Sequence, residues 1–196
     1  MSDSKIRKKQ MMGKARVLFT RLGYSGASMK NLAEAFGCKP ANIYNYFASK
    51  EDLLFEVLRE EMEQIVQPVA HLEFDEISEP LDELLSFMQN HARVTLGYRR
   101  SAKMLFDTEL GHLSPAKRKV IVDLRRQYDR ILVHIIEAGV EKGIFQPTNV
   151  KLAAYGIASM IARSRVWYSP RGGLNPDQVG EFLFHLILGG LRGEER

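Results

Sequence analysis

The chain has 196 residues, of which 45% are hydrophobic and 27% charged, so it can bury a full core in one or two domains. Its single cysteine, Cys38, excludes an intramolecular disulfide framework and a cysteine-rich zinc site. No apolar run approaches the roughly 18 residues of a membrane span, and the basic first ten residues lack the apolar stretch of a secretory signal. We therefore expect a soluble, cytoplasmic protein with no membrane partner.

The charge is distributed unevenly along the chain. Residues 1–50 hold ten lysines and arginines against two acidic residues, a net charge of +8, whereas the other 146 residues have a net charge of −4. The overall charge of +4 therefore hides a strongly basic amino-terminal quarter. Such asymmetry is typical of a surface that binds nucleic acid or an anionic membrane.

Residues 28–47, SMKNLAEAFGCKPANIYNYF, have the pattern of two short helices around a tight turn. A first helix, with apolar residues at helical spacing, precedes them and ends at Gly23. Ser28 is a good cap for the second helix, Gly37 allows a sharp stop after it, and Pro40 suits the first turn of the third. In the most basic part of the chain, this pattern predicts a helix-turn-helix that binds DNA.

A fourth helix is expected after Ser49, which forms a weak capping box with Asp52. Beyond Pro68, the acidic stretch HLEFDEISE is interpreted as a connector. The chain is thereby divided into a DNA-binding head of residues 1–65, with its helix-turn-helix at 28–47, and a body of residues 66–196.

The body has helical periodicity throughout and no strand pattern. The expected helices run from Pro80 to Gly97 and on to Gly111, from Pro115 to Gly143, from about 150 to 168 after a cap at Thr148 or Asn149, and from Pro176 after Asn175. An all-α fold is therefore predicted.

Several positions of the head resemble the amino-terminal signature of TetR-family transcriptional regulators: Gly23, Ser28–Met29, Leu32–Ala33, Gly37, Ile43–Tyr44–Asn45–Tyr46–Phe47 and Lys50–Glu51–Asp52–Leu53. The similarity covers about residues 6–55. It implies an all-α protein with a three-helix helix-turn-helix head and a carboxy-terminal helical domain for ligand binding and dimerisation. Two positions depart from the family pattern. Lys39 replaces the usual Ser or Thr, which removes a side-chain cap worth ~1 kcal/mol, and Tyr44–Asn45–Tyr46 replaces a tyrosine-x-histidine.

The family pattern implies that residues in and around the third helix face double-stranded DNA, a palindromic operator. Asn42 and Asn45 are the candidates for reading bases, because an amide can pair bidentately with adenine, and Lys50 is a candidate for binding phosphate. The predicted DNA-binding residues are Ser28, Lys30, Lys39, Pro40, Ala41, Asn42, Tyr44, Asn45, Tyr46 and Lys50. The alternative is that these polar residues form only a solvated helix face.

The stretch Trp167-Tyr168-x-Pro170-x-Gly172-Gly173 is similar to the carboxy-terminal domain of the TetR-family branch that senses acyl-CoA thioesters in fatty-acid and steroid degradation. This similarity implies an acyl-CoA effector, with arginines on its phosphates, Trp167 on its adenine and apolar residues around its tail. The predicted ligand-binding residues are Met88, Met104, Phe106, Leu132, Ile136, Met160, Arg163, Arg165, Trp167 and Arg171. No metal and no cofactor besides this effector are expected.

Other interpretations of the ligand-binding residues stay open. The effector is a different hydrophobic or planar molecule if the protein regulates an efflux or stress operon, and there is no small ligand if the arginines are a surface pair and the methionines plain core. Residues 182–190 are apolar on nearly all sides, which predicts that the last two helices form a homodimer, unless they complete the core of a monomer. The expected protein is a homodimeric repressor that its effector releases from the operator.

Two other classes are weighed against a regulator. An enzyme is not expected, because the five histidines lack metal-ligand spacing and neither a nucleophile elbow nor a phosphate-binding glycine loop is present. Cys38 has no base placed beside it in the sequence and is interpreted as a half-buried small apolar residue rather than a redox sensor. A membrane-surface module built on the first helix is disfavoured, because its narrow apolar face is needed to pack the head.

Overall fold

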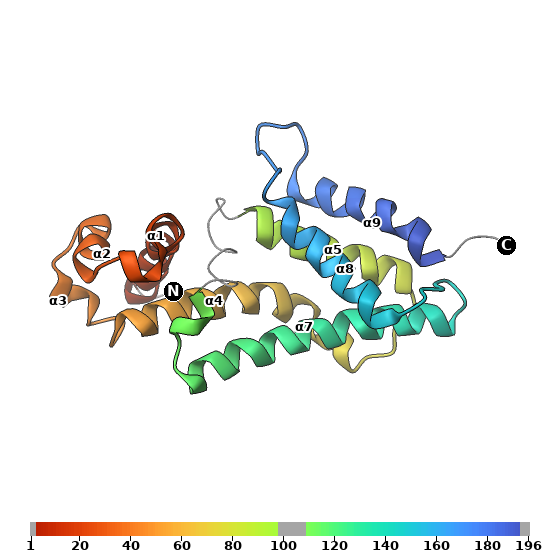
Figure 1. Ribbon diagram of the computed structural model, residues 1–196, viewed down its shortest axis with the longest axis horizontal. Helices are drawn as coiled ribbons and strands as arrows, with labels where there is room; N and C mark the ends of the chain where they lie inside the picture. Colours follow the sequence, from red (N-terminus) through yellow and green to blue (C-terminus); the bar gives the residue numbers. More distant parts are fainter. Residues whose placement is uncertain (1–2, 98–108, 193–196) are drawn as a thin grey trace. The chain divides into compact units, whose positions relative to one another are not determined.

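The computed structural model describes residues 3–97 and 109–192. Within these ranges the chain forms α-helices and two 3-10 helices and no strand, which confirms the all-α prediction. The α-helices are α1 (Asp3–Gly26), α2 (Met29–Phe36), α3 (Pro40–Ile43), α4 (Lys50–Val66), α5 (Pro80–Gly97), α7 (Pro115–Glu141), α8 (Val150–Ser164) and α9 (Pro176–Arg192) (Figure 1). The 3-10 helices are η1 (Gln67–Glu73) and η2 (Leu110–His112). Most of the segment predicted between Gly97 and Gly111 lies outside the described residues.

The helices form two compact units. Residues 3–62 and 109–122 make the head unit, and residues 63–97 and 123–192 make the body unit. The sequence predicted a single boundary at residue 65, whereas the structure adds η2 and the first two turns of α7 to the head unit. As a result, α4 and α7 each contribute residues to both units.

Four of the described helices are capped by the side chain of the residue just before them. The capping side chains are Ser28, Ser49, Asn149 and Asn175, and each accepts a hydrogen bond from the backbone N–H three residues later at 3.0–3.1 Å. Such a cap satisfies one of the unpaired N–H groups of the first turn. The sequence predicted three of these positions and left the fourth open between Thr148 and Asn149, because capping is a local property of the chain.

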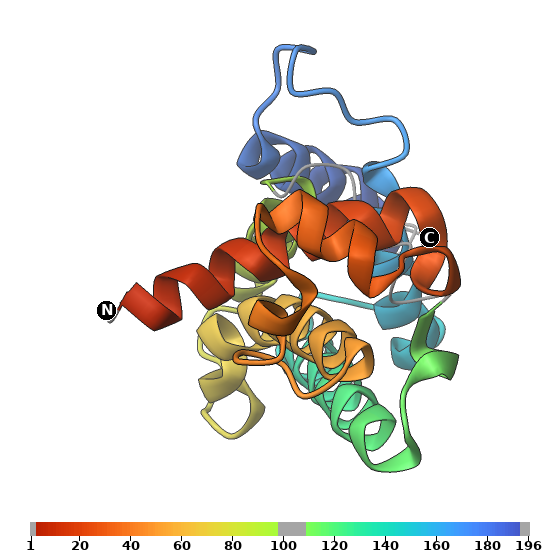
Figure 2. The ribbon, with the colours of Figure 1, turned by 90° about the vertical axis from the view of Figure 1, so that its left-hand side faces the viewer.

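Two glycines with positive φ end the first two helical runs. Gly23 (φ 70°) interrupts α1, which continues for one more turn to Gly26, and Gly37 (φ 68°) ends α2 in the left-handed conformation. In the head unit, α2 contacts both α1 and α3 (Figure 2). Ala15, Phe19 and Leu32 are almost completely buried there.

The acidic stretch after Pro68 is more than a connector. Residues 67–73 form η1, and Val69, Leu72 and Ile77 are buried. The Glu73 carboxylate accepts hydrogen bonds from Arg130 Nε at 2.6 Å and Gln127 Nε2 at 2.8 Å on α7. The many charged residues of this stretch obscured its apolar positions in the sequence. In the structure these apolar side chains are buried and pack the stretch against the body unit.

In the body unit, α5 packs against α8 and α9, and α8 packs against α9 (Figure 1). The crossing of α5 and α9 is close because Gly180 presents no side chain to α5. A Cβ atom at Gly180 would lie 2.8 Å from the Cα atom of Gln89, closer than a side chain can approach the backbone. The body core therefore depends on glycine at this position.

Gly180→Ala should lower the free energy of unfolding by about 1–3 kcal/mol, because the added methyl group forces α5 and α9 apart. Gly13→Ala is the matched control, since the site of its Cβ has no atom within 4 Å, and this helix-interior substitution should raise stability by up to about 1 kcal/mol. Urea denaturation followed by circular dichroism measures both. Equal effects of the two substitutions would contradict the close α5–α9 contact.

Candidate nucleic-acid interface and effector domain

Two buried side chains, one at the end of α3 and one after the turn that follows it, orient this segment. Ile43 (0% exposed) and Phe47 (2%) point into the head unit, and the backbone N–H groups of Tyr46 and Phe47 donate to the carbonyl of Ile43 at 2.9 and 3.0 Å. Regular helix ends at Ile43, so Tyr44, Asn45 and Tyr46 lie in a turn rather than in the helix. Asparagine and tyrosine are weak helix formers, which fits this early end.

The predicted DNA-reading side chains lie on the outside of this segment. Asn42, Tyr44 and Asn45 are exposed, and Tyr46 is half-buried. Lys39, Pro40, Ala41, Ser28 and Lys30 are exposed as well. Lys39 is the N-cap residue of α3 and makes no side-chain cap, as its departure from the family pattern predicted. A DNA contact stays a prediction for each of these residues.

Ser28 and Lys50 both have structural partners in the head unit. Ser28 Oγ donates to Asn31 Oδ1 at 2.6 Å as part of its capping box. Lys50 Nζ donates to the carbonyls of Tyr24 at 2.9 Å and Ala27 at 3.0 Å, at the end of α1. An ammonium group has three N–H donors. Lys50 uses two of them for these carbonyls, which leaves one for a phosphate.

A cluster of charges links the start of α4 to the start of α7 within the head unit. Lys117 Nζ lies 2.6 Å from Asp52 Oδ1 and 3.2 Å from Glu51 Oε1. The backbone N–H of Ser114 donates to Glu51 Oε1 at 2.9 Å, so this carboxylate also caps the amino terminus of α7. These contacts explain why residues 109–122 group with the head unit.

The same contacts shift the pKa values of all three groups. The hydrogen bond from Ser114 lowers the pKa of Glu51, and the hydrogen bond from Lys117 lowers the pKa of Asp52. The hydrogen bond to Asp52 raises the pKa of Lys117. Each shift favours the charged form, so the cluster is fully ionised near neutral pH.

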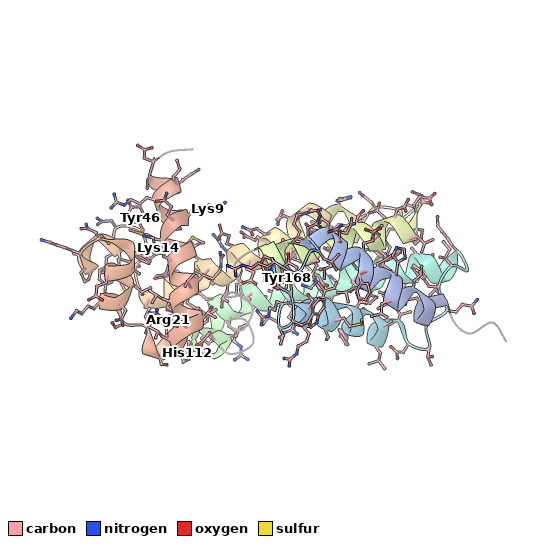
Figure 3. The ribbon with its side chains drawn as sticks, turned by 90° about the horizontal axis from the view of Figure 1, so that it is seen from above. Lys9, Lys14, Arg21, Tyr46, His112 and Tyr168 are labelled. Carbon is pink, nitrogen blue, oxygen red and sulfur yellow. The ribbon has the colours of Figure 1, made fainter. Side chains whose placement is uncertain are left out.

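Most of the cations in the basic amino-terminal segment are available to a partner. Seven of the ten are exposed: Lys5, Arg7, Lys9, Lys14, Arg21, Lys30 and Lys39. Lys9, Lys14 and Arg21 are labelled along α1 in Figure 3. Arg16 is buried and pairs with Glu60 at 3.0 Å, and Lys8 pairs with Glu56 at 3.1 Å. Five of these exposed cations lie on α1, one on α2 and one at the N-cap of α3, so they give the head unit a positive surface.

The structure separates the predicted ligand-binding residues into two groups. Met88, Leu132 and Ile136 are fully buried in the body unit, and Met160 on α8 is half-buried. At the end of α8 and beyond it, Arg163 and Arg171 are exposed, Arg165 is half-buried and Trp167 is 56% exposed. Met104 and Phe106 lie outside the described residues.

Helices α8 and α9 expose large apolar side chains. Leu152 and Tyr155 on α8 are 67% and 51% exposed, and Phe182 and Leu186 on α9 are 56% and 59% exposed. The other side of α9 is buried through Val179, Leu183 and Phe184. An apolar surface on two adjacent helices is unusual for a surface that faces only water.

A groove of about 620 Å³ lies along α7 in the body unit, and sequence reasoning did not find it. Its lining is largely charged: Glu73, Arg126, Asp129, Arg130, Glu137 and Lys151, with Phe74, Val133, His134 and Tyr155. Burial raises the pKa of the Asp129 carboxyl, although Arg125 opposes this shift. None of the predicted ligand-binding residues lines this groove.

Sequence reasoning also missed a set of buried polar groups between α5 and α7. His91, Thr95 and Tyr128 are 4%, 8% and 5% exposed, and His91 Nδ1 lies 2.8 Å from the Tyr128 hydroxyl. They could have been noticed in the sequence because they are polar residues at positions where the helical period predicts apolar ones. Among the described residues, no group of three or more His, Cys, Asp or Glu side chains is arranged to hold a metal ion. Cys38 is half-buried, as predicted.

No helix within residues 3–97 or 109–192 is long and apolar enough to cross a membrane.

Two family models match the chain. Residues 12–57 match the family described as bacterial regulatory proteins, tetR family, and residues 78–191 match the tetracyclin repressor-like carboxy-terminal domain. The transcriptional repressor KstR2 of Mycolicibacterium smegmatis is 27% identical over 193 residues, which cover 97% of this chain and 93% of that protein. These matches extend over both units.

Solved structures give the same result. The TetR family transcriptional regulator PfmR from Thermus thermophilus is 30% identical, with a TM-score of 0.82, over 95% of this chain and 100% of that one. AibR, in a crystal structure with isovaleryl coenzyme A and operator DNA, shares the fold at 22% identity and a TM-score of 0.78, over 92% of this chain and 97% of that one.

Lys117→Met should lower the free energy of unfolding by a few tenths to about 1 kcal/mol near pH 7, because Glu51 and Asp52 lose their shared cation. Both carboxyl pKa values are lowered in the folded state, so their stabilisation is complete above the usual values of 4.5 and 3.8 and is lost as the pH falls through the lower folded values. The difference between wild type and variant should therefore be constant between about pH 6 and pH 9 and shrink below about pH 4.

Urea denaturation at a series of pH values measures this difference. Arg118→Met is the control, because Arg118 is a neighbouring exposed cation, and its replacement should change stability by less than about 0.5 kcal/mol. A loss for Lys117→Met that is as large at pH 3 as at pH 7 would show that the ion pairs do not cause it.

Proposed function

Because the chain belongs to the TetR family of bacterial regulatory proteins, we propose that it is a homodimeric, cytoplasmic repressor that a hydrophobic effector, an acyl-CoA thioester, releases from a palindromic operator. Members of this family are DNA-binding transcriptional regulators and not enzymes, so the chain is a regulator. The sign of regulation, the oligomeric state, the effector and the form of the operator are the parts that we propose.

The observation that carries the proposal is the outward face of α3 and the turn after it. Ile43 and Phe47 hold this segment to the head unit, so Asn42 and Asn45 face solvent on a basic surface. Amide side chains of this kind can read adenine in the major groove, and an exposed lysine such as Lys39 can bind a phosphate. One short helix reads few base pairs, which favours two heads on a two-fold symmetric operator.

The apolar surface of α8 and α9 supports the homodimer. Leu152, Tyr155, Phe182 and Leu186 are each more than half exposed in a single chain, so water contacts a large apolar area. A two-fold axis at this surface would bring the same two helices of a second copy against it and bury these side chains in a four-helix interface. The gain comes from removing apolar area from water.

Two observations support an acyl-CoA as the effector: the relatives of the chain, and the division of the predicted ligand-binding residues into an exposed and a buried group. KstR2 is named a transcriptional repressor, and AibR has been crystallised with isovaleryl coenzyme A and operator DNA. In this chain the exposed Arg163, Arg171 and Trp167 suit the phosphates and adenine of coenzyme A. The buried Met88 and Leu132 suit an apolar tail.

Release from DNA requires that the effector bind one conformation more tightly than the other. A ligand with equal affinity for the DNA-bound and released conformations would shift nothing, however tightly it binds. Helices α4 and α7 contribute residues to both units, so a change in the body unit that moves either helix also acts on the head unit. We assign the coupling to these two helices.

Asn45→Ala should relax base choice at one operator position, where the lost contact is worth about 1–3 kcal/mol of discrimination. Lys39→Ala should instead weaken binding to all DNA sequences about equally and reduce the slope of log affinity against log salt by about one. Fluorescence anisotropy on operator variants at several salt concentrations separates the two. Lys151→Ala, an exposed lysine of the body unit, is the control. A loss for Asn45→Ala that is the same on every sequence would refute base reading.

A long-chain acyl-CoA should weaken binding to the DNA upstream of the protein's own gene by about tenfold or more, whereas free coenzyme A and the free fatty acid should not. Anisotropy at fixed, moderate salt measures this change, and Trp167→Ala should reduce the response without reducing DNA binding. If DNA binding is tight and no thioester changes it, the chain is still a DNA-binding regulator, but its effector is a different hydrophobic or planar molecule and not an acyl-CoA.

A further inference from the structure

The body unit buries a hydroxyl group that has no hydrogen-bond partner. Thr95 on α5 is only 8% exposed, and its Oγ1 atom makes no hydrogen bond. A threonine inside a helix commonly bonds a backbone carbonyl three or four residues earlier, yet Thr95 does not use this option. Buried polar groups are almost always paired, so an unpaired one in a protein's core requires an explanation.

Two more buried polar side chains lie along the face of α5 that carries this hydroxyl. His91 precedes Thr95 by four residues, which places both on the same face of α5. That face is turned towards α7, because His91 Nδ1 lies 2.8 Å from the hydroxyl of Tyr128 and the Phe87 ring lies 4.9 Å from the Tyr128 ring. The phenol and the imidazole are therefore hydrogen-bonded between α5 and α7, and the Thr95 hydroxyl lies about one helical turn further along the same face of α5.

The Tyr128 phenol is neutral and can act as a donor. Burial raises its pKa well above the ordinary value. When His91 Nδ1 carries a proton, it donates to the phenol oxygen, and the phenol O–H then becomes available to another acceptor. Together with the Thr95 hydroxyl, this arrangement offers two donors to an oxygen atom that enters the core.

The polar cluster adjoins residues predicted to hold the apolar part of the effector. Met88 lies three residues before His91 on α5, and Leu132 lies four residues after Tyr128 on α7, so each shares a helix face with its polar neighbour. Both Met88 and Leu132 are fully buried. An acyl tail packed against these two side chains would pass beside the unpaired hydroxyl.

We propose that Thr95, His91 and Tyr128 form a polar subsite that hydrogen-bonds a keto or hydroxyl oxygen on the buried part of the effector. The regulator then selects an acyl group that carries such an oxygen over a saturated one. This inference rests on the proposed function for the coenzyme A portion of the effector, but the subsite itself requires only a hydrophobic molecule with an oxygen atom. A site built to bond an oxygen discriminates against analogues that lack it, because its own polar groups are then left unpaired.

The test compares decanoyl-CoA with decanoyl-CoA derivatives that carry one keto or hydroxyl group along the chain. Isothermal titration calorimetry on the full-length protein measures each affinity. Wild type should bind at least one oxygenated derivative about fivefold or more tightly than decanoyl-CoA. Thr95→Val should remove this preference, and Thr95→Ser, which keeps the hydroxyl, should restore it.

Stability measurements and a control variant separate this role from a structural one. Thr95→Val preserves the shape of the side chain and removes an unpaired hydroxyl, so its melting temperature should equal or exceed that of wild type. Thr20→Val makes the same change in the head unit, at a hydroxyl that donates to the carbonyl of Arg16 at 2.9 Å, and should leave the preference intact. Thioesters that all bind to wild type, with equal affinities, or a preference that survives in Thr95→Val, would overturn the subsite.

A second probe does not depend on coenzyme A. The NMR signal of the Thr95 methyl group should shift on addition of cyclohexanone but not of cyclohexane. If no thioester binds and the cyclohexanone shift occurs, the acyl-CoA effector is wrong and the subsite stands. If neither thioesters nor cyclohexanone bind, the subsite is overturned.

Discussion

The head unit depends on the contact of the Lys50 ammonium with the end of α1. Its Nζ donates to the carbonyls of Tyr24 and Ala27, and it lies 4.1 Å from the centre of the Tyr24 ring. The last carbonyls of a helix carry partial negative charge and lack partners within the helix, so a cation stabilises them. This contact joins the residues just before α2 to those just after the α3 turn. Lys50 thus joins the two ends of the helix-turn-helix.

The residues next to Lys50 extend this constraint to a distant part of the chain. Glu51 and Asp52 hold the amino terminus of α7 through Lys117 and Ser114, and the ring of His112 stacks on Tyr24 at 4.7 Å. The residues that follow the turn with the predicted DNA-contacting side chains therefore also contact the start of α7. Since α7 continues into the body unit, a movement of this helix would affect residues of both units.

Local patterns were sufficient to predict much of the fold. Ser28, Ser49, Asn149 and Asn175 cap helices because their side chains reach N–H groups three residues away, and a sequence displays that spacing directly. The role of Lys50 was not predictable in this way. Its partners lie 23 and 26 residues earlier, and only the folded head unit brings them together. The pairing of Lys117 with Asp52 spans a still longer separation, so the assignment of residues 109–122 to the head unit escaped the sequence analysis.

The candidate sites also differ in how far they could be predicted from local sequence. Asn42 and Asn45 could be predicted to be exposed because the segment is continuous in sequence, and the burial of Ile43 and Phe47 turns them outward. His91, Thr95 and Tyr128 come from two helices, and each alone looks like a polar interruption of an apolar period. An unpaired hydroxyl in a core costs stability that a valine would not. We therefore explain the buried Thr95 hydroxyl in the body unit by the effector oxygen that we propose it binds.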